Sequence, residues 1–325
     1  MQKNIAIIAG GNSGESVISI QSAEVVIKNI DTTKYAPYII IIKEKDWYFK
    51  NDNSIKVDKN DFSITINGKK IVFEVIFNVI HGTPGEDGFL QGYFDLLNLP
   101  YTSCGMLTSA LTFNKSICND LVEKYGVLVG KTILIKKNDC IKVAEIIAEL
   151  GLPCFVKPNK GGSSIGISKV FISDELENAI NKAFEQDNEV IIQKYIKGRE
   201  ITCGVISINK ELNALPITEI VSQNDYFDYE AKYLGKSKEI TPAQIPKTIE
   251  KECKSTSLYL YKMLNCKGVV RFDYIISNNQ TYFLEVNTVP GLSESSIIPQ
   301  QANAIGISTT KLFTILIEEA LQDKI

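Results

Sequence analysis

Two β-rich runs near the C-terminal end constrain the fold of this chain more than any other feature. They cover residues 269–276 and 281–286, and the turn-forming residues 277–280 separate them. Valine, isoleucine, phenylalanine and tyrosine recur in both runs, whereas serine, asparagine and glutamine occupy the turn. The stretch therefore predicts a β-hairpin.

Polar side chains follow one predicted face of this hairpin. If it folds symmetrically about Asn279, Asp273 lies opposite Glu285 and Arg271 lies opposite Asn287. Side chains alternate between the two faces of a strand, so these four polar groups share one face. The opposite face is then filled by apolar side chains, namely Phe272, Tyr274, Leu284 and Val286.

The polar face suggests a chemical role. A carboxylate directly opposite another is destabilising unless something neutralises the pair. Two carboxylates and an amide oxygen are hard ligands that suit Mg²⁺ carried by a nucleotide, and the neighbouring guanidinium can stabilise a phosphate or an oxyanion. The spacing alone is equally compatible with a solvated face that carries an Arg–Asp ion pair, so the rest of the chain has to decide.

Length and composition exclude several classes of protein. At 325 residues the chain is long enough for two or three domains. A net charge of −3, without a dense Lys/Arg tract, argues against a nucleic-acid partner. His81 is the only histidine, which excludes a multi-histidine metal site. No apolar run approaches the roughly 20 residues that span a bilayer, so we expect no membrane partner.

Cysteine usage and the N-terminus indicate the compartment. The seven cysteines are odd in number and form no CxxC motif, which is typical of reduced thiols in a cytosolic protein. The first residues, MQKNIAIIAGG, form a short strand that runs into glycines, not a signal peptide. We therefore expect a cytoplasmic enzyme.

The N-terminal part has the pattern of an open α/β sheet. An apolar strand over residues 4–9 leads into a glycine turn at 10–14 and a helix over 15–30, and the ligand crevice of such a unit lies at the carboxyl end of the strand. The turn reads GGxxG rather than GxGxxG, so it is a weak dinucleotide signal. Glu15 is first interpreted as a helix-start residue, with a ligand role as the second interpretation.

A second glycine-rich loop, residues 81–88, follows a predicted strand over 71–80 and precedes a helix over 89–97. We expect it at the same edge of the sheet as the first loop, where function often concentrates. Another strand covers 35–42, and the polar insert 46–70 is expected at the periphery.

The middle of the chain contains a misleading GKT sequence at residues 130–132. A P-loop requires four residues between its glycines, and only three separate Gly126 from Gly130. The sequence predicts a helix over 106–125 and strand at 127–129 and 133–135, so we reject a Walker A motif.

A more convincing phosphate site follows the predicted helix over residues 139–150. The strands 154–156 and 167–172 enclose a glycine- and serine-rich loop, and Lys157 stands at the end of the first strand. Such a loop can fold its N–H groups over a polyphosphate, and the lysine can reach the phosphates. An ordinary mobile hairpin loop is the alternative.

Beyond these strands the sequence predicts a helix over 174–185, a strand over 201–208, a lid and two further helices. Residues 222–241 are too polar for a core and too aromatic for a plain linker, which suggests a substrate loop. Helices are predicted over 246–264 and 309–321, and a loop over 290–299.

Five segments carry a resemblance to a known family. In chain order they read GGNSGESVIS, HGTPGEDGFLQGYFDLLNLPYT, FVKPNKGGSSIGISKV, FDYEAKY and the hairpin RFDY…LEVNTVPGL. Over essentially its whole length the chain resembles the D-alanine–D-alanine ligases of the ATP-grasp superfamily. The resemblance implies an α/β and α+β fold with three domains: an N-terminal open α/β domain (1–103) for the first D-alanine, a central ATP-grasp domain (104–197) and a C-terminal one (198–325). It also implies a homodimer.

The resemblance assigns roles to individual residues. The nucleotide site is implied to comprise Lys115, Lys157, Ser163, Ser164, Gln193, Lys194, Tyr195, Ile196 and Glu200. Two Mg²⁺ ions, replaceable by Mn²⁺, are implied at Asp273, Glu285 and Asn287. The first substrate is implied to lie at Glu15 and His81, with Ser163 and Tyr233 in a network with Glu15. Lys232 is implied at the transferred phosphate, Arg271 and Gly291 at the oxyanion, and Ser296 and Ile297 at the second substrate.

The implied reaction is the ATP-dependent joining of two D-alanines through a D-alanyl phosphate, for peptidoglycan precursor synthesis. In two places the chain departs from the family: Gln193 replaces a frequent acidic residue, and Glu294-Ser295 replaces a less acidic pair. Three other functions remain: a ligase with another carboxylate or acceptor (including D-lactate or D-serine), a dinucleotide-binding oxidoreductase, and a nucleotide-binding module without catalysis.

Overall fold

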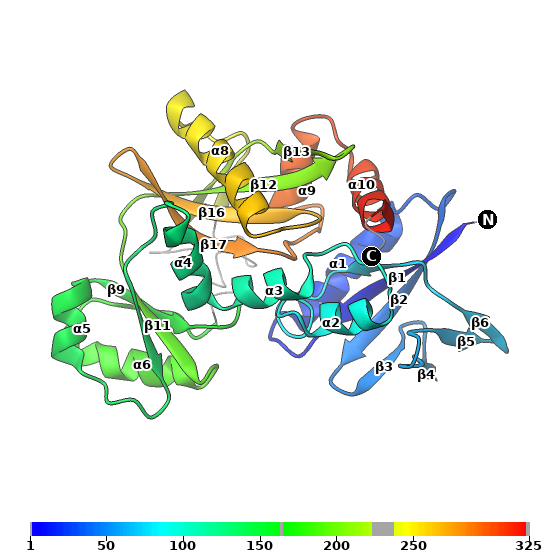
Figure 1. Ribbon diagram of the computed structural model, residues 1–325, viewed down its shortest axis with the longest axis horizontal. Helices are drawn as coiled ribbons and strands as arrows, with labels where there is room; N and C mark the ends of the chain where they lie inside the picture. Colours follow the sequence, from blue (N-terminus) through cyan, green and yellow to red (C-terminus); the bar gives the residue numbers. More distant parts are fainter. Residues whose placement is uncertain (1, 163–164, 223–236, 323–325) are drawn as a thin grey trace.

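The computed structural model describes residues 2–162, 165–222 and 237–322 of the chain. Three main sheets organise these residues, together with a small two-stranded one. Figure 1 shows the N-terminal sheet at the right, the central sheet at the lower left and the C-terminal sheet above them. The fold is thus of the mixed α/β and α+β type that the sequence predicts.

The N-terminal sheet has the order β4-β3-β2-β1-β7, with β2 and β7 parallel to β1. Helix α1 follows β1, and helix α2 follows the second glycine-rich loop. The predicted strand over 71–80 is shorter than expected, because its first residue pairs in the separate β5–β6 hairpin of the peripheral insert. The bounds are β1 (Lys3–Gly10), α1 (Ser16–Asn29), β2 (Tyr35–Lys43), β3 (Asp46–Phe49), β4 (Asp52–Lys56), β5 (Ile64–Ile66), β6 (Lys69–Ile71), β7 (Val75–Asn78) and α2 (Phe89–Leu96).

The two glycine-rich loops meet at one edge of this sheet, as expected. The backbone N–H of Asn12, in the first loop, donates to the carbonyl oxygen of Thr83, in the second, at 3.0 Å. Gly10 begins the first loop with a φ of 102°, and a Cβ there would lie 2.6 Å from the carbonyl oxygen of Ile42. Only glycine fits this turn without strain.

The central sheet is antiparallel, in the order β10-β9-β11-β8, and the helices α5 and α6 pack on it. The predicted helix over 139–150 begins only at Val143, and 127–129 form no strand apart from a bridge between Val129 and Phe283. The bounds are β8 (Thr132–Lys136), α5 (Val143–Leu150), β9 (Cys154–Pro158), β10 (Ser168–Val170), the 3₁₀ turn η1 (Ser173–Glu175), α6 (Leu176–Phe184) and β11 (Glu189–Lys194).

The predicted helix over 106–125 is two helices, α3 (Met106–Phe113) and α4 (Lys115–Lys124). Asn114 separates them with an extended backbone, and its side chain caps α4 by accepting from the N–H of Ile117 at 3.1 Å. The side chain of Asn159 also accepts from the N–H of Ser116 at 2.9 Å. These contacts fix the start of α4, and with it Lys115, beside the strand that carries Lys157.

The C-terminal sheet has the order β15-β14-β12-β16-β17, with β13 paired to β12. Helix α8 covers one face, where the hydroxyls of Ser257 and Tyr274 lie 2.9 Å apart. Part of the loop predicted over 290–299 is helical, because α9 begins at Ile297. The bounds are β12 (Arg199–Ile208), β13 (Glu211–Ala214), β14 (Thr218–Ser222), β15 (Ser237–Ile240), α8 (Lys247–Met263), β16 (Val270–Ser277), β17 (Gln280–Asn287), α9 (Ile297–Asn303) and α10 (Thr309–Gln322).

One hydrophobic core joins the N-terminal and C-terminal sheets. Helix α10 packs against the N-terminal sheet, with the rings of Phe77 and Phe313 5.5 Å apart in an edge-to-face contact. The same cluster includes Ile206 of β12 and Ile298 of α9. The central sheet has a separate core of its own.

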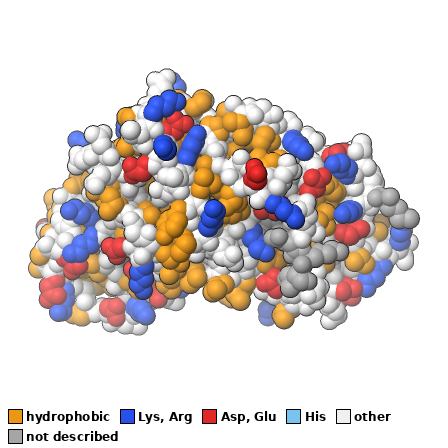
Figure 2. All heavy atoms as spheres, turned by 45° about the horizontal axis from the view of Figure 1, so that its top comes forward, with side chains coloured by type: hydrophobic (Ala, Val, Ile, Leu, Met, Phe, Trp, Pro, Cys, Tyr) orange, Lys and Arg blue, Asp and Glu red, His pale blue; other side chains and the backbone are white. Residues whose placement is uncertain are grey.

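The molecular surface is mixed in charge. Figure 2 shows Lys and Arg interspersed with Asp and Glu, among scattered apolar side chains, on the face that it presents. Among the helices of the described ranges, none combines the length and apolar character needed to cross a bilayer.

The hairpin β16–β17 has the predicted pairs at its open end but not near its turn. Asp273 pairs with Glu285, and a bulge then shifts the register so that Tyr274 pairs with Phe283. Leu284 is the extra residue, and it lines a cavity instead of filling the apolar face, whereas Phe283 is 1% exposed within the core. The prediction for Leu284 was therefore wrong, and the cause is the bulge.

The bulge makes the two neighbouring side chains differ in their contribution to stability. We expect Phe283→Ala to lower the free energy of unfolding by about 3–5 kcal/mol, because it leaves a cavity in the core. Leu284→Ala should cost less than about 1 kcal/mol, since its side chain is only partly buried. Urea denaturation of both variants checks this; equal losses would contradict the bulged register.

Candidate active site

A cavity of about 690 Å³ lies where the three main sheets meet. Every described residue to which the sequence analysis gave a role lines it, from all parts of the fold. These residues are Glu15, His81, Lys115, Lys157, Gln193, Lys194, Tyr195, Ile196, Glu200, Arg271, Asp273, Glu285, Asn287, Gly291, Ser296 and Ile297. Ser163, Ser164, Lys232 and Tyr233 lie outside the described residues.

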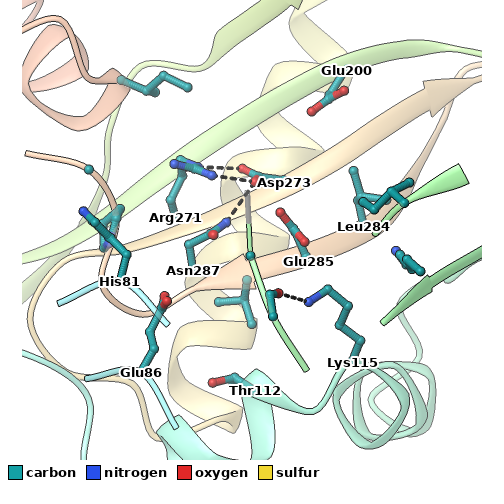
Figure 3. A pocket seen from close by; sticks show the side chains of 18 of the residues that line it. His81, Glu86, Thr112, Lys115, Glu200, Arg271, Asp273, Leu284, Glu285 and Asn287 are labelled. Atoms are coloured by element: carbon teal, nitrogen blue, oxygen red, sulfur yellow. Dashed lines mark hydrogen bonds and ion pairs between the residues drawn. The ribbon is translucent and has the colours of Figure 1, made fainter. Parts of the chain in front are cut away.

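The carboxylate of Asp273 is the centre of the cavity (Figure 3). It accepts from Nε and Nη2 of Arg271, both at 2.9 Å, from the amide of Asn287 at 2.9 Å and from the hydroxyl of Thr202 at 2.5 Å. The pairs Asp273–Glu285 and Arg271–Asn287 are those predicted. The alternative of a solvated face is wrong, although its Arg–Asp ion pair is present, because Asp273 is only 3% exposed.

This donor set fits a hard divalent cation. Asp273 and Glu285 supply two carboxylates, and Asn287 donates through its nitrogen to Asp273, which turns its amide oxygen away from that bond. Carboxylate and amide oxygens are the ligands that Mg²⁺ prefers. Within the described parts of the chain, no group of three or more His, Cys, Asp or Glu side chains offers an alternative metal site.

Two lysines, Lys115 and Lys157, line the same cavity. Nζ of Lys115 donates to the carbonyl oxygen of Gly161 at 2.5 Å, and Nζ of Lys157 donates to Oε1 of Gln193 at 3.0 Å. Lys157 is buried, so its charge acts through little water. Figure 3 shows Lys115 and Leu284 together on one side of Asp273.

The amide of Gln193 has a fixed orientation. Its nitrogen donates to the hydroxyl of Thr132 at 3.3 Å, while its oxygen accepts from Lys157. Reversing the amide would place two donors, its NH₂ and the lysine, against each other. The oxygen therefore faces Lys157 at this end of the cavity.

On the opposite side of Asp273 lie His81 and Glu86 (Figure 3). Nδ1 of His81 is 2.9 Å from the carbonyl oxygen of Val289; because a carbonyl only accepts, Nδ1 carries the hydrogen. Nε2 is buried and has no partner among the described residues, so it is an acceptor available to a ligand. Glu15 is also buried. The backbone of Gly162 packs closely against its carboxylate, since a Cβ added at Gly162 would lie only 2.6 Å from Oε2 of Glu15.

Glu86 is a cavity residue that sequence reasoning missed. Its carboxylate accepts from the N–H of Gly82 at 2.9 Å and from that of Val289 at 3.2 Å. Burial raises the pKa of this carboxyl, against the lowering effect of His81. His81 and Glu86 thus hold both polar groups of Val289, and they fix the segment that leads to Gly291. The sequence signal that could have identified Glu86 is its position in the glycine-rich loop 81–88.

The far end of the cavity, beyond Arg271, is lined by residues of the 291–297 segment. The hydroxyls of Ser293 and Ser296 lie 2.7 Å apart, and a Cβ on Gly291 would lie 2.8 Å from the hydroxyl oxygen of Ser296. Glu239 of β15 lines this end as well, and the sequence analysis gave it no role. We call this region, formed by the 291–297 segment together with Glu239, the distal end.

Comparison with known proteins identifies the family. Residues 4–104 match the family described as D-ala D-ala ligase N-terminus, and residues 121–318 match D-ala D-ala ligase C-terminus. The D-alanine–D-alanine ligase of Flavobacterium johnsoniae is 50% identical over 98% of this chain and 99% of its own length.

Solved structures agree with this assignment. The VanG D-Ala:D-Ser ligase of Enterococcus faecalis is 35% identical, with a TM-score of 0.87 over 98% of this chain and 100% of that one. The D-alanine–D-alanine ligase of Bacillus anthracis in complex with ATP is 30% identical, with a TM-score of 0.81 over 99% of this chain and 98% of that one. The chain belongs to the D-alanine–D-alanine ligase family and has its ATP-grasp fold.

Proposed function

We propose that this protein is an ATP- and Mg²⁺-dependent ligase that joins two D-alanine molecules into D-alanyl-D-alanine for peptidoglycan synthesis. The observation that carries the proposal is the single cavity in which the Asp273 cluster, two lysines and the buried pair Glu15 and His81 meet. The names of relatives at 40–50% identity over nearly the whole chain support it.

The nucleotide binds between the central and C-terminal sheets. Lys115 and Lys157 neutralise its phosphates, together with the loop that contains Ser163 and Ser164. The adenine and ribose lie between the end of β11 and the facing wall of the cavity. The residues that line this part are Gln193, Lys194, Tyr195, Ile196, Glu200 and Leu284. The oxygen of Gln193, already bound to Lys157, keeps a second lone pair for the adenine amino group.

Asp273, Glu285 and Asn287 hold the metal. We propose two Mg²⁺ ions, with Mn²⁺ able to replace them, because the set supplies only hard oxygen ligands. When bound, the ions neutralise charge on the phosphates. Arg271 keeps both oxygens of Asp273 oriented before the metal arrives.

The chain's residues then act on two successive substrates. Glu15 binds the ammonium of the first D-alanine, with His81 beside it and Ser163 and Tyr233 in the same network. The carboxylate of this substrate attacks the γ-phosphoryl group, whose charge Lys232 helps to neutralise. The bond between the γ-phosphorus and the bridging oxygen breaks, so the products are a D-alanyl phosphate and ADP.

The amine of the second D-alanine, bound at Ser296 and Ile297, attacks the carbonyl carbon of this acyl phosphate. Arg271 and the backbone N–H of Gly291 stabilise the oxyanion, and phosphate leaves as the peptide bond forms. Closure of the substrate loop over the cavity would keep water from the acyl phosphate.

We also propose three domains (1–103, 104–197 and 198–325), a homodimer and a cytoplasmic location. Helix α4 falls within 104–197 but packs on the C-terminal sheet through Cys118 and Val122, so the boundary between the central and C-terminal domains is not a clean cut at residue 197. Sedimentation equilibrium at the mass of two chains tests the dimer.

The direct test of the function is product analysis. We expect phosphate release only when D-alanine, ATP and Mg²⁺ are all present, and D-alanyl-D-alanine as the product by mass spectrometry. Competing D-lactate and D-serine in the same mixture identify any other acceptor. Phosphate release that is indifferent to D-alanine would contradict the proposal.

Asp273→Asn tests the metal site. The amide keeps the size of the side chain but removes the charge that neutralises Arg271 and binds the metal, so we expect kcat/KM to fall on the order of a thousandfold. The circular dichroism spectrum should remain that of the wild type. Asp120→Asn, on the exposed face of α4, is the control and should retain activity; a binding module without catalysis would tolerate both changes.

Gly162→Ala tests the contact between the glycine-rich loop and Glu15. The added Cβ would lie 2.6 Å from Oε2 of Glu15, so either the loop or the Glu15 carboxylate must move, and their contact at the first substrate's ammonium site is lost. We expect the KM for the first D-alanine to rise about tenfold, with more ATP hydrolysed per dipeptide, because positioning and water exclusion both suffer. In Gly105→Ala the new Cβ has no neighbour closer than 3.9 Å; a similar loss there would contradict the explanation.

A further inference from the structure

Glu239 is an acidic side chain in the cavity to which the proposed mechanism gives no task. It lies on β15, where it pairs with Ile220 of β14, which in turn pairs with Glu200 of β12. Directly paired residues on neighbouring strands point to the same face of a sheet. The carboxylate therefore faces the cavity, at the distal end that Ser295, Ser296 and Ile297 also line.

Helix α9 holds this carboxylate in place. Nε2 of Gln300 donates to Oε2 of Glu239 at 2.6 Å and to the carbonyl oxygen of Ser295 at 2.8 Å. One amide thus ties Glu239 to the segment that contains Ser296. The carboxylate has a fixed position relative to the proposed site of the second substrate.

The charge of Glu239 is not neutralised by that hydrogen bond, because an amide carries no net charge. Burial raises the pKa of the Glu239 carboxyl, although the bond from Gln300 and the charge of Arg271 act in the opposite direction. Arg271 already makes two hydrogen bonds to Asp273. A partly buried carboxylate in this position is stabilised when a positively charged ligand enters the cavity beside it.

The second substrate of the proposed reaction can supply that cation. An amino acid enters with an ammonium group, whereas a hydroxy acid of the same shape carries a neutral hydroxyl in its place. We propose that Glu239 makes the distal end selective for an acceptor with an ammonium group over the matching hydroxy acid. The inference rests on the proposed ligase function.

The competing explanation is structural: Glu239 would serve only to hold α9 through Gln300. The two roles respond differently to conservative changes. Glu239→Gln keeps the size and can still accept from Gln300 through its amide oxygen, but it removes the charge. Glu239→Asp keeps the charge on a shorter side chain.

The experiment follows D-alanyl-D-alanine and D-alanyl-D-lactate formed from D-alanine and D-lactate in competition at saturating ATP. In Glu239→Gln we expect the preference for D-alanine as acceptor to fall about tenfold or more, because a charge-assisted contact is lost. The KM for the second D-alanine should rise by a similar factor, while those for ATP and the first D-alanine stay within about twofold. Glu239→Asp should retain most of the preference.

Glu211→Gln is the matched control, because it removes the same charge from an exposed position on β13 of the same sheet. It should behave as the wild type. If Glu239→Gln leaves the preference unchanged, or if both products fall equally in the Gln and Asp variants, the inference is overturned and Glu239 is structural. A wild-type enzyme that forms no dipeptide would instead overturn the proposed function, together with the inference that rests on it.

Discussion

The buried ion pair between Arg271 and Asp273 is the interaction on which the whole cavity depends. Moving a carboxylate out of water is costly, and four hydrogen bonds to the two oxygens of Asp273 offset that cost. The same bonds hold both oxygens against Arg271 and Asn287, with Glu285 nearby (Figure 3). The arrangement of these side chains therefore depends on the pairing of β12, β16 and β17.

The other parts of the site are held against this centre by hydrogen bonds between side chains and the backbone of distant segments. Val289, just beyond the hairpin, is held by His81 and Glu86 of the N-terminal loop. Lys115 is brought close by the start of α4, which Asn114 caps and Asn159 contacts. These contacts explain why residues more than 200 positions apart form one cavity, and why the loops need glycine where backbones meet closely.

The sequence predicted the parts of this site that depend on local pattern. The alternation of polar and apolar side chains was enough to place Asp273 opposite Glu285, because hairpin partners are close in the chain. It was not enough to find the bulge, because Phe283 and Leu284 are both apolar and either suits the core. The break at Asn114 had a signal, since asparagine favours the N-cap position, but the helical pattern on both sides concealed it.

Glu86 and Glu239 show where such reasoning ends. Their importance comes from burial against segments that are remote in sequence, and an acidic residue in a loop or on an edge strand is ordinarily exposed. Only the pairing of β14 with β15, and the approach of α9, turn Glu239 towards the cavity. Resemblance to a family identified the residues of shared motifs, and neither of these two was among those it assigned.

The joint core beneath α10 has a consequence for how the three sheets can move. The N-terminal and C-terminal sheets share one set of packed side chains, so rotating one against the other would tear that packing open. The central sheet, with its independent core, has no such tie. It can therefore shift relative to the other two sheets without opening the core that they share.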